Sequence, residues 1–275
     1  MRRRSFSPIP ALALFAAVPV AAWAQSPLDM PIQIRGGAMI LDLHTELRVD
    51  SRKLHGSDID LEDDLGVTRT PAIPFGEFQI GNRFRILVAF FESIRRGKED
   101  AGQSLRFNGE VMALPGDSLN ARSELRDGDL IFGTRLYGSV GFRIDILLGG
   151  KYLHIANRIS NEEHPLPPGV TRRSSTDTLD FGSMYGGLGG FLTITSRLSI
   201  QARILFSRYT ANLFQVERFN YTDFAFGVTY VLFDWLSLQA EYRLLDLDVV
   251  DERGGTRTAY HTVGNGIGIG GLIAF

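Results

Sequence analysis

The chain has 275 residues, of which 44% are hydrophobic and 22% are charged, so it is too apolar to remain a disordered polymer. Its formal net charge of −2 excludes the strongly basic surface that is typical of nucleic-acid-binding proteins. It has no cysteine, which excludes disulfides, thiol catalysis and thiolate metal sites. Its stability must therefore come from its fold or from the solvent around it.

The first 24 residues, MRRRSFSPIPALALFAAVPVAAWA, have the pattern of a secretory signal peptide. Three arginines precede an apolar stretch that is too short to span a bilayer, and a small-x-small site ends at Ala24. We expect residues 1–24 to be removed and residues 25–275 to form one domain. Removal takes away three arginines and no acid, which changes the formal net charge from −2 to −5.

After this segment the residues alternate between apolar and polar, which is typical of strands with two different faces. In WLSLQAEYRLL, residues 235–245, Leu238 and Leu244 share the apolar face and Arg243 lies on the other. In MILDLHTELRVD, residues 39–50, the same rule assigns the Met39 side to lipid and the Asp42 side to the interior. Each such segment is long enough to cross a membrane as a tilted strand.

Short and long connections alternate along the chain, as in outer-membrane barrels with short periplasmic turns and longer extracellular loops. This predicts an all-β fold, a closed antiparallel transmembrane β-barrel of about ten strands. The expected strands are 36–50, 71–81, 83–95, 128–138, 141–156, 178–194, 197–208, 221–233, 235–246 and 258–275. Residues 104–114 are expected to form a hairpin above the membrane; eight or twelve strands, and a secreted β-sandwich, remain alternatives.

The C-terminal segment GNGIGIGGLIAF ends on an aromatic residue after alternating apolar ones. A barrel closes by pairing its last strand with its first, because lipid tolerates no unpaired strand edge. Phe275, Ile273 and Ile269 resemble the assembly signal of small Gram-negative outer-membrane β-barrel proteins, and the segment DIDLEDDLGV resembles one found in uncharacterised proteobacterial barrels. The resemblance implies location in the outer membrane and delivery by the barrel-assembly machinery. An aromatic belt at the periplasmic side is expected from Trp235, Phe233, Phe275, Tyr137 and Phe142.

The polar faces of the expected strands carry charges of both signs, which favours a charged core that packs the lumen over a pore selective for one sign. Small barrels are filled by side chains, whereas water-filled porins need about sixteen strands. A narrow channel for small solutes remains the alternative. The expected lumen charge network is Asp42, Glu46, Glu77, Arg83, Arg85, Arg135, Arg143, Asp145, Lys151, Arg203, Glu241 and Arg243.

Three motifs suggest chemistry at the outer rim, and each lacks a necessary part. The acidic stretch HGSDIDLEDDLG could bind calcium, but it does not have EF-hand spacing, so a solvated loop is favoured. Omptin proteases carry an Asp-x-His pair, whereas here Leu247 is followed by Asp248. His154-Ile155-Ala156-Asn157 resembles the His-x-Ser-Asn of lipid A deacylases, but Ala156 stands in place of the nucleophile. We therefore expect no metal, no cofactor and no catalytic residue.

Basic residues lie beyond several strand ends, where lipopolysaccharide phosphates would be. We expect a monomeric, non-enzymatic protein in contact with outer-membrane lipid and lipopolysaccharide, with loops available for surface contacts. The basic residues are Arg52, Lys53, Arg95, Arg96, Lys98, Arg172 and Arg173.

Overall fold

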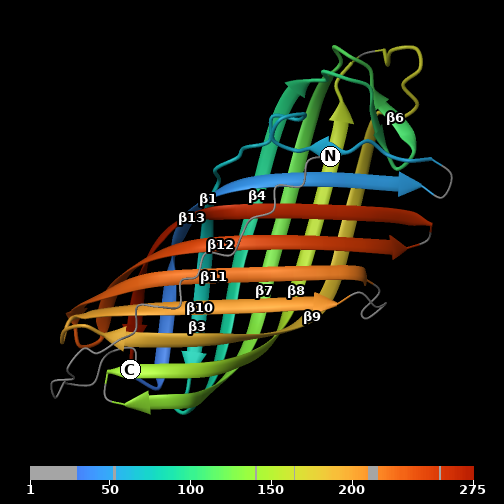
Figure 1. The fold of residues 1–275 in the computed structure, drawn as a ribbon. Helices are drawn as coiled ribbons and strands as arrows, with labels where there is room; N and C mark the ends of the chain where they lie inside the picture. The colour runs from blue at the N-terminus through green and yellow to red at the C-terminus, as the bar shows by residue number, and fades with distance from the viewer. Residues whose placement is uncertain (1–29, 52–53, 140, 164, 210–215, 254) are drawn as a thin grey trace.

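The computed structural model describes residues 30–51, 54–139, 141–163, 165–209, 216–253 and 255–275 (Figure 1). The expected signal peptide lies outside these residues and stays a prediction. No helix that could cross a membrane is found among them. The strands are β1 (Ile32–Ser51), β2 (Ile59–Asp60), β3 (Ala72–Ile80), β4 (Phe84–Asp100), β5 (Leu105–Phe107), β6 (Glu110–Ala113), β7 (Ser118–Ser139), β8 (Phe142–Asn161), β9 (Ser174–Thr193), β10 (Leu198–Tyr209), β11 (Val216–Phe233), β12 (Leu236–Arg253) and β13 (Thr256–Ala274).

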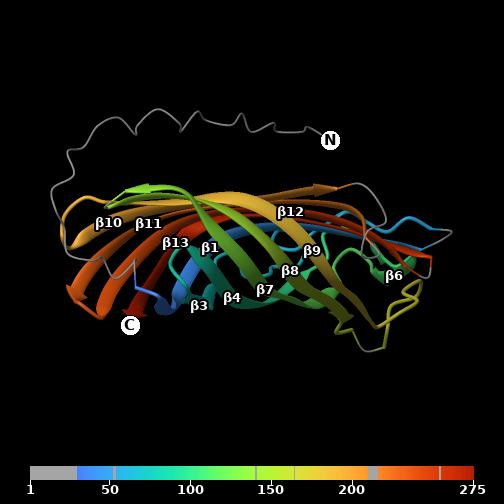
Figure 2. The same ribbon diagram turned by 90° about the horizontal axis from the view of Figure 1, so that it is seen from below.

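Ten of these strands form a closed antiparallel ring in the order β1, β3, β4, β7, β8, β9, β10, β11, β12, β13. β13 closes on β1 from Gln33↔Ala274 to Ser51↔Thr256. The ring is strongly tilted and flattened, and β10 to β13 cross over β4, β7 and β8 (Figures 1 and 2). The prediction of a ten-stranded antiparallel barrel is confirmed.

The remaining strands lie outside the ring. β2 pairs with the outer end of β1, and β5 pairs with β6 in a separate hairpin. The hairpin turns at Asn108-Gly109, both of which have positive φ, as a tight two-residue turn requires. Residues 104–114 therefore form the hairpin expected above the membrane, and the twelve-stranded alternative does not hold.

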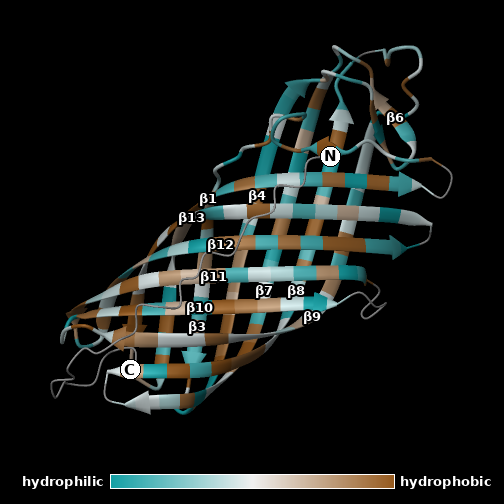
Figure 3. Ribbon diagram, viewed as in Figure 1, coloured by the Kyte–Doolittle hydropathy of each residue, from teal (hydrophilic) through white to brown (hydrophobic). Residues whose placement is uncertain are grey.

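The outer surface of the barrel divides into two halves. Near the end where β1 begins and β13 finishes, the outward side chains are apolar and exposed, as at Ile146, Leu148, Ile204 and Ile269. Toward the other end, the outward positions of the same strands are polar and the inward ones are apolar and buried. Brown and teal positions alternate along the strands in Figure 3. The apolar half is the membrane belt, and the other half stands in water around its own hydrophobic core.

This inversion corrects the predicted faces of β1. Met39, Leu41 and Leu43 are 1–3% exposed and point into the barrel, whereas Asp42 and Glu46 point outward. From Asp42 onward β1 lies above the belt, where water meets the outer face and apolar residues gather inside. The lipid face of β1 lies lower, at Ile34 and Ile40, which are 47% and 58% exposed.

The same inversion explains why several strands are longer than expected. β7 begins at Ser118 rather than near residue 128, and β12 continues to Arg253 rather than ending near 246. The outward faces of these extensions carry polar residues, which resemble loops in sequence. The extensions are strands because their inward residues, such as Leu119 and Val249, are fully buried.

Candidate functional site

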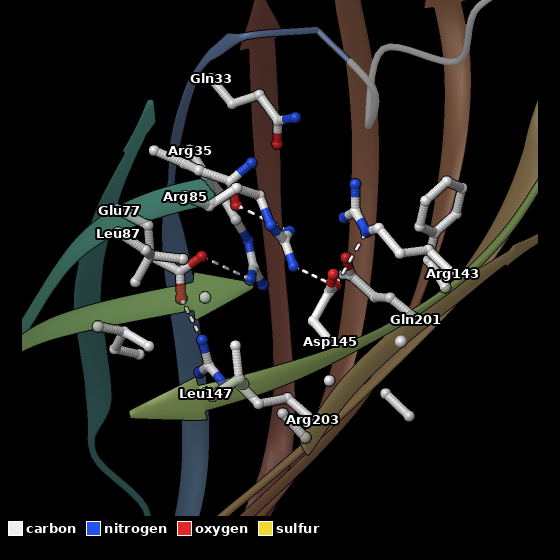
Figure 4. Close-up of a pocket in the computed structure, with 18 of the residues that line it drawn as sticks. Gln33, Arg35, Glu77, Arg85, Leu87, Arg143, Asp145, Leu147, Gln201 and Arg203 are labelled. Atoms are coloured by element: carbon white, nitrogen blue, oxygen red, sulfur yellow. Dashed lines mark hydrogen bonds and ion pairs between the residues drawn. The ribbon is translucent and has the colours of Figure 1, made fainter. Parts of the chain in front are cut away.

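The lower lumen, inside the membrane belt, holds a network of arginines and carboxylates. Arg35 of β1 donates to Glu77 of β3 at 3.1 Å and to Glu241 of β12 at 2.9 Å (Figure 4). Arg203 of β10 reaches the other oxygen of Glu77 at 3.5 Å. Glu77 of β3 thus joins guanidinium groups of β1 and β10, and these opposite charges compensate one another.

A second cluster of charged side chains lies beside this network in the lower lumen. Arg85 of β4 and Arg143 of β8 both bind Oδ2 of Asp145, the latter through Nε at 2.9 Å. The Arg143 guanidinium also stacks over the ring of Phe191, at 4.5 Å from its centroid. Between the two groups lies a cavity of about 120 Å³ that Gln33, Gln79, Gln201 and Gln239 help to line. This volume is enough for several water molecules.

The next layer of the lumen holds two further buried ion-pair groups. Arg243 donates from Nε and Nη2 to the two oxygens of Asp223, both at 2.8 Å, over the ring of Phe91. Lys151 has no exposed side-chain surface and binds Asp127 and Asp129 of β7. Its ammonium also lies 4.5 Å from the ring centroid of Tyr221. Each buried charge has an opposite charge beside it, which is the condition for keeping ions in such a space.

Above this layer the interior is apolar, and residues 54–70 form a lid on its side, between β1 and β4. Leu61 donates its N–H to Thr45 of β1 at 2.9 Å, and Thr68 donates its N–H to Arg96 of β4 at 3.1 Å. The segment buries Ile59, Leu61, Leu65 and Val67. Glu62 reaches down from this segment to Arg95, and its Oε2 also accepts the N–H of Thr45 at 2.7 Å. The acidic stretch is therefore a structural lid with one buried carboxylate, not the fully solvated loop that was expected.

The structure separates the twelve charged residues of the predicted network. It brings eight together inside the barrel. They are Glu77, Arg85, Arg143, Asp145, Lys151, Arg203, Glu241 and Arg243. Asp42 and Glu46 lie outside because of the inversion of β1, and Arg83 is exposed in the turn between β3 and β4. Arg135 lies half-buried at a β-bulge near the turn between β7 and β8, next to Arg85.

Sequence reasoning missed several inward charges, among them Arg35, Asp127, Asp129 and Asp223. The signal was present in the alternation. Asp223 lies two, four and six residues from Ala225, Gly227 and Thr229 on one face of β11. Asp127 and Asp129 share a face with Ile131. They were missed because the expected strand began at residue 128, so they stood at its end, where a loop was expected.

Histidines lie beside carboxylates at three places on the outer wall, an arrangement that could serve metal binding or catalysis. His44 lies 3.5 Å from Asp60 and 3.8 Å from Glu62, a set that could hold an ion by geometry. Glu62 already binds Arg95, which weakens it as a ligand. His154 lies 2.7 Å from Asp180 on the outer wall, and the next outward residue on β8 is Ala156, which supplies no hydroxyl. His261 lies 3.3 Å from Asp246, and this hydrogen bond raises the pKa of His261.

The residues of the expected assembly signal lie at the closure of the ring. Phe275 donates its N–H to the carbonyl of Ile32 at 2.9 Å, and Ile269 points outward. At the same end, the rings of Phe233 and Trp235 stack 6.0 Å apart, and Tyr137 lies 6.0 Å from Phe142. These aromatic residues lie at the turns, at the level of the expected periplasmic belt.

Comparisons with known proteins agree with the architecture. No family model and no curated protein matches the sequence. The outer membrane protease OmpT of Escherichia coli is similar, with a TM-score of 0.56 and 12% identity over 89% of this chain and 96% of that chain. The translocator domain of the autotransporter NalP of Neisseria meningitidis has a TM-score of 0.42, with 10% identity over 89% and 88%. OprG of Pseudomonas aeruginosa has a TM-score of 0.37, with 11% identity over 89% and 96%.

The likeness to OmpT establishes the fold alone, that of an outer-membrane β-barrel, and at 12% identity it carries no activity to this chain. Together with the closed ring and the outward apolar belt, this fold places the protein in the outer membrane.

Proposed function

We propose that this outer-membrane barrel is a monomeric, non-enzymatic surface protein. Its interior is closed to ions, and its outer wall and loops contact lipopolysaccharide and other partners outside the cell. Its insertion through the barrel-assembly machinery, guided by Phe275, Ile273 and Ile269, belongs to the same proposal.

The observation that supports a closed interior best is the layer around Lys151. This side chain is wholly buried, and the carboxylate of Asp127 on β7 is 2% exposed. Below it, Asp223 has no exposed side-chain surface and binds Arg243. A conducting lumen would hydrate such groups, whereas here protein atoms compensate their charges. The apolar core adds a second barrier above this layer.

Two other functions fit the structure less well. A narrow channel would have to pass both the layer around Lys151 and the apolar core. The cavity between the two lower arginine groups measures only about 120 Å³. A rim enzyme would need an activated nucleophile or water beside a histidine. The pairs His154–Asp180 and His261–Asp246 lie on the outer wall, and neither has an adjacent serine on its own strand.

The deciding experiment is single-channel recording on the chain from Gln25 to Phe275, refolded and inserted into planar bilayers. Folding is verified beforehand by the heat-dependent shift of a barrel in gel electrophoresis. We expect inserted protein without discrete current steps. Reproducible steps of fixed size would refute a closed interior and favour the channel.

A further inference from the structure

The outer wall over β4, β7 and β8 carries three arginines in one row above the membrane belt. Arg96 is paired in register with Arg122, and Arg122 with Arg158. All three are exposed on the outer face. Like charges directly opposite on neighbouring strands repel one another, so this row is unfavourable without an anion to bind.

Acids of the protein neutralise the row incompletely. Arg122 contacts Glu124 at 3.2 Å, but the other oxygen of Glu124 binds Arg126 at 2.6 Å. Arg126 also takes Glu92, at 2.6 Å. No ion pair of Arg96 or Arg158 is found among the described side chains. The row therefore keeps positive charge available for an external ligand.

A hollow lies lower on the same wall, over β4, β7, β8 and β9 and within the belt. Its floor includes Gly128, Gly150 and Gly182, and Phe90, Leu130, Tyr152 and Met184 stand around it. The open space measures about 690 Å³. A Cβ added at Gly128 would meet no atom within 4 Å, so the glycine leaves room on the lipid side rather than inside the barrel.

The order along the wall fits an amphiphile with chains below and anionic groups above. On β7 the outward positions run from Gly128 through Arg126 to Arg122. Six residues of a strand span about 20 Å, or roughly 15 Å in height at the tilt of a membrane barrel. The outer leaflet provides such a molecule, because lipopolysaccharide has acyl chains in the membrane and phosphates on the sugars above.

We propose that this face binds one lipopolysaccharide molecule, with an acyl chain in the hollow at Gly128 and sugar phosphates on Arg96, Arg122 and Arg158. Arginine is suited to this role because its planar fork binds two phosphate oxygens at once. The inference deepens the proposed surface role and rests on it. The two can fail separately, because conductance reports on the lumen and lipid binding reports on the wall.

The other wall supplies a matched control. There Arg48 binds Asp50 at 2.9 Å, Arg218 binds Asp248 at 3.0 Å and Arg257 binds Glu217 at 3.3 Å. These arginines face outward like those of the row, but each has a carboxylate beside it. R48Q/R218Q/R257Q thus removes the same charge as R96Q/R122Q/R158Q without touching the proposed site.

The test measures binding of purified lipopolysaccharide to the refolded chain in detergent, by isothermal titration. Its probes are lipopolysaccharide with a phosphorylated inner core, the same preparation treated with phosphatase, lipid A alone, and inorganic phosphate. We expect R96Q/R122Q/R158Q to weaken binding of the phosphorylated form on the order of 100-fold. The control triple variant should bind within about 3-fold of the unaltered chain, and dephosphorylation should act like the loss of the row.

Equal losses in the two triple variants would overturn the proposal, as would full binding after phosphatase treatment. Inorganic phosphate that competes at the same concentration as the lipid would show a simple anion site and overturn the assignment to a glycolipid. Gly128→Val fills the hollow and should weaken binding of both lipopolysaccharide and lipid A. Unchanged lipid A binding in Gly128→Val would overturn the placement of an acyl chain there.

Discussion

Lys151 binds the diagonal Asp127 more closely than Asp129, which stands directly opposite it in the register of β7 and β8. Its Nζ lies 2.6 Å from both oxygens of Asp127 and 2.9 Å from the nearer oxygen of Asp129. Asp129 is held instead by the hydroxyl of Tyr185, which donates to it at 2.9 Å. Lys151 is thus the main partner of Asp127, and Tyr185 is a second partner of Asp129.

Loss of the Lys151 ammonium should destabilise the barrel strongly. Lys151→Met leaves Asp127 and Asp129 buried without their cation, at an expected cost of about 3 to 5 kcal/mol. K151M/D127N/D129N removes all three charges and should recover much of the lost stability. Unfolding in denaturant, followed by tryptophan fluorescence in detergent micelles, measures both. A single variant as stable as the unaltered chain would mean that water already reaches this layer.

The membrane belt can be tested along one face of β10. Ile204 is 39% exposed within the belt, and an arginine there should cost about 2 to 4 kcal/mol in lipid. Arg208 lies on the same face four residues further, above the belt, and Arg208→Ile should change stability by less than about 0.5 kcal/mol. Folding equilibria in lipid vesicles measure the difference. Comparable costs at both positions would place the belt elsewhere.

The inverted half can be tested with two neighbours on β1. Leu43 is 2% exposed inside the barrel, so Leu43→Ala should cost about 2 to 5 kcal/mol. Asp42→Ala next to it should stay within roughly 0.5 kcal/mol, apart from its exposed pair with Arg69. Denaturant unfolding in detergent compares the two. The reverse order of effects would restore the faces that sequence alone predicted.

The lid should depend on its one buried carboxylate. Glu62→Ala leaves Arg95, which is 3% exposed, without its partner and should open residues 54–70 more often. We expect faster cleavage of this segment by an added protease while the rest of the barrel resists. Asp63→Ala serves as the control, because Asp63 follows Glu62 in the chain but is exposed. Equal cleavage rates in the two variants would show that the apolar residues alone hold the lid.

The outer wall should respond to pH through His261. Asp246 raises its folded pKa above the unfolded value of 6.5, so its contribution to stability is complete below pH 6.5. That contribution should fade as pH rises through the folded pKa. Melting temperatures recorded between pH 5.5 and 8.5 should fall in this window for the unaltered chain. Asp246→Asn should flatten the profile, and an unchanged slope in that variant would assign the effect to another group.

The alternation of β4, β8, β10 and β12 predicted both the strands and their faces, because these segments begin within the belt. Arg85, Arg143, Lys151 and Arg243 could be placed inside for the same reason. On β1 most of the clearest alternation, at residues 39–50, lies above the belt, and a rule that assumes lipid outside gives the opposite face there. Which solvent surrounds a strand depends on its height in the assembled ring, and that height is not encoded in any one segment.

The polar outer half also sets a condition on how the barrel is inserted. If the strands entered the membrane from the periplasm, Arg122, Arg158 and Asp246 would have to pass through the hydrocarbon before reaching the far side. Each charge at the midplane carries a cost of a few kcal/mol in a spontaneous crossing. Unaided insertion into a thick, intact bilayer should therefore be slow, and a thinned or opened membrane should speed it. The polar outer face that suits this half of the barrel to water thus raises the free-energy cost of its passage through the membrane.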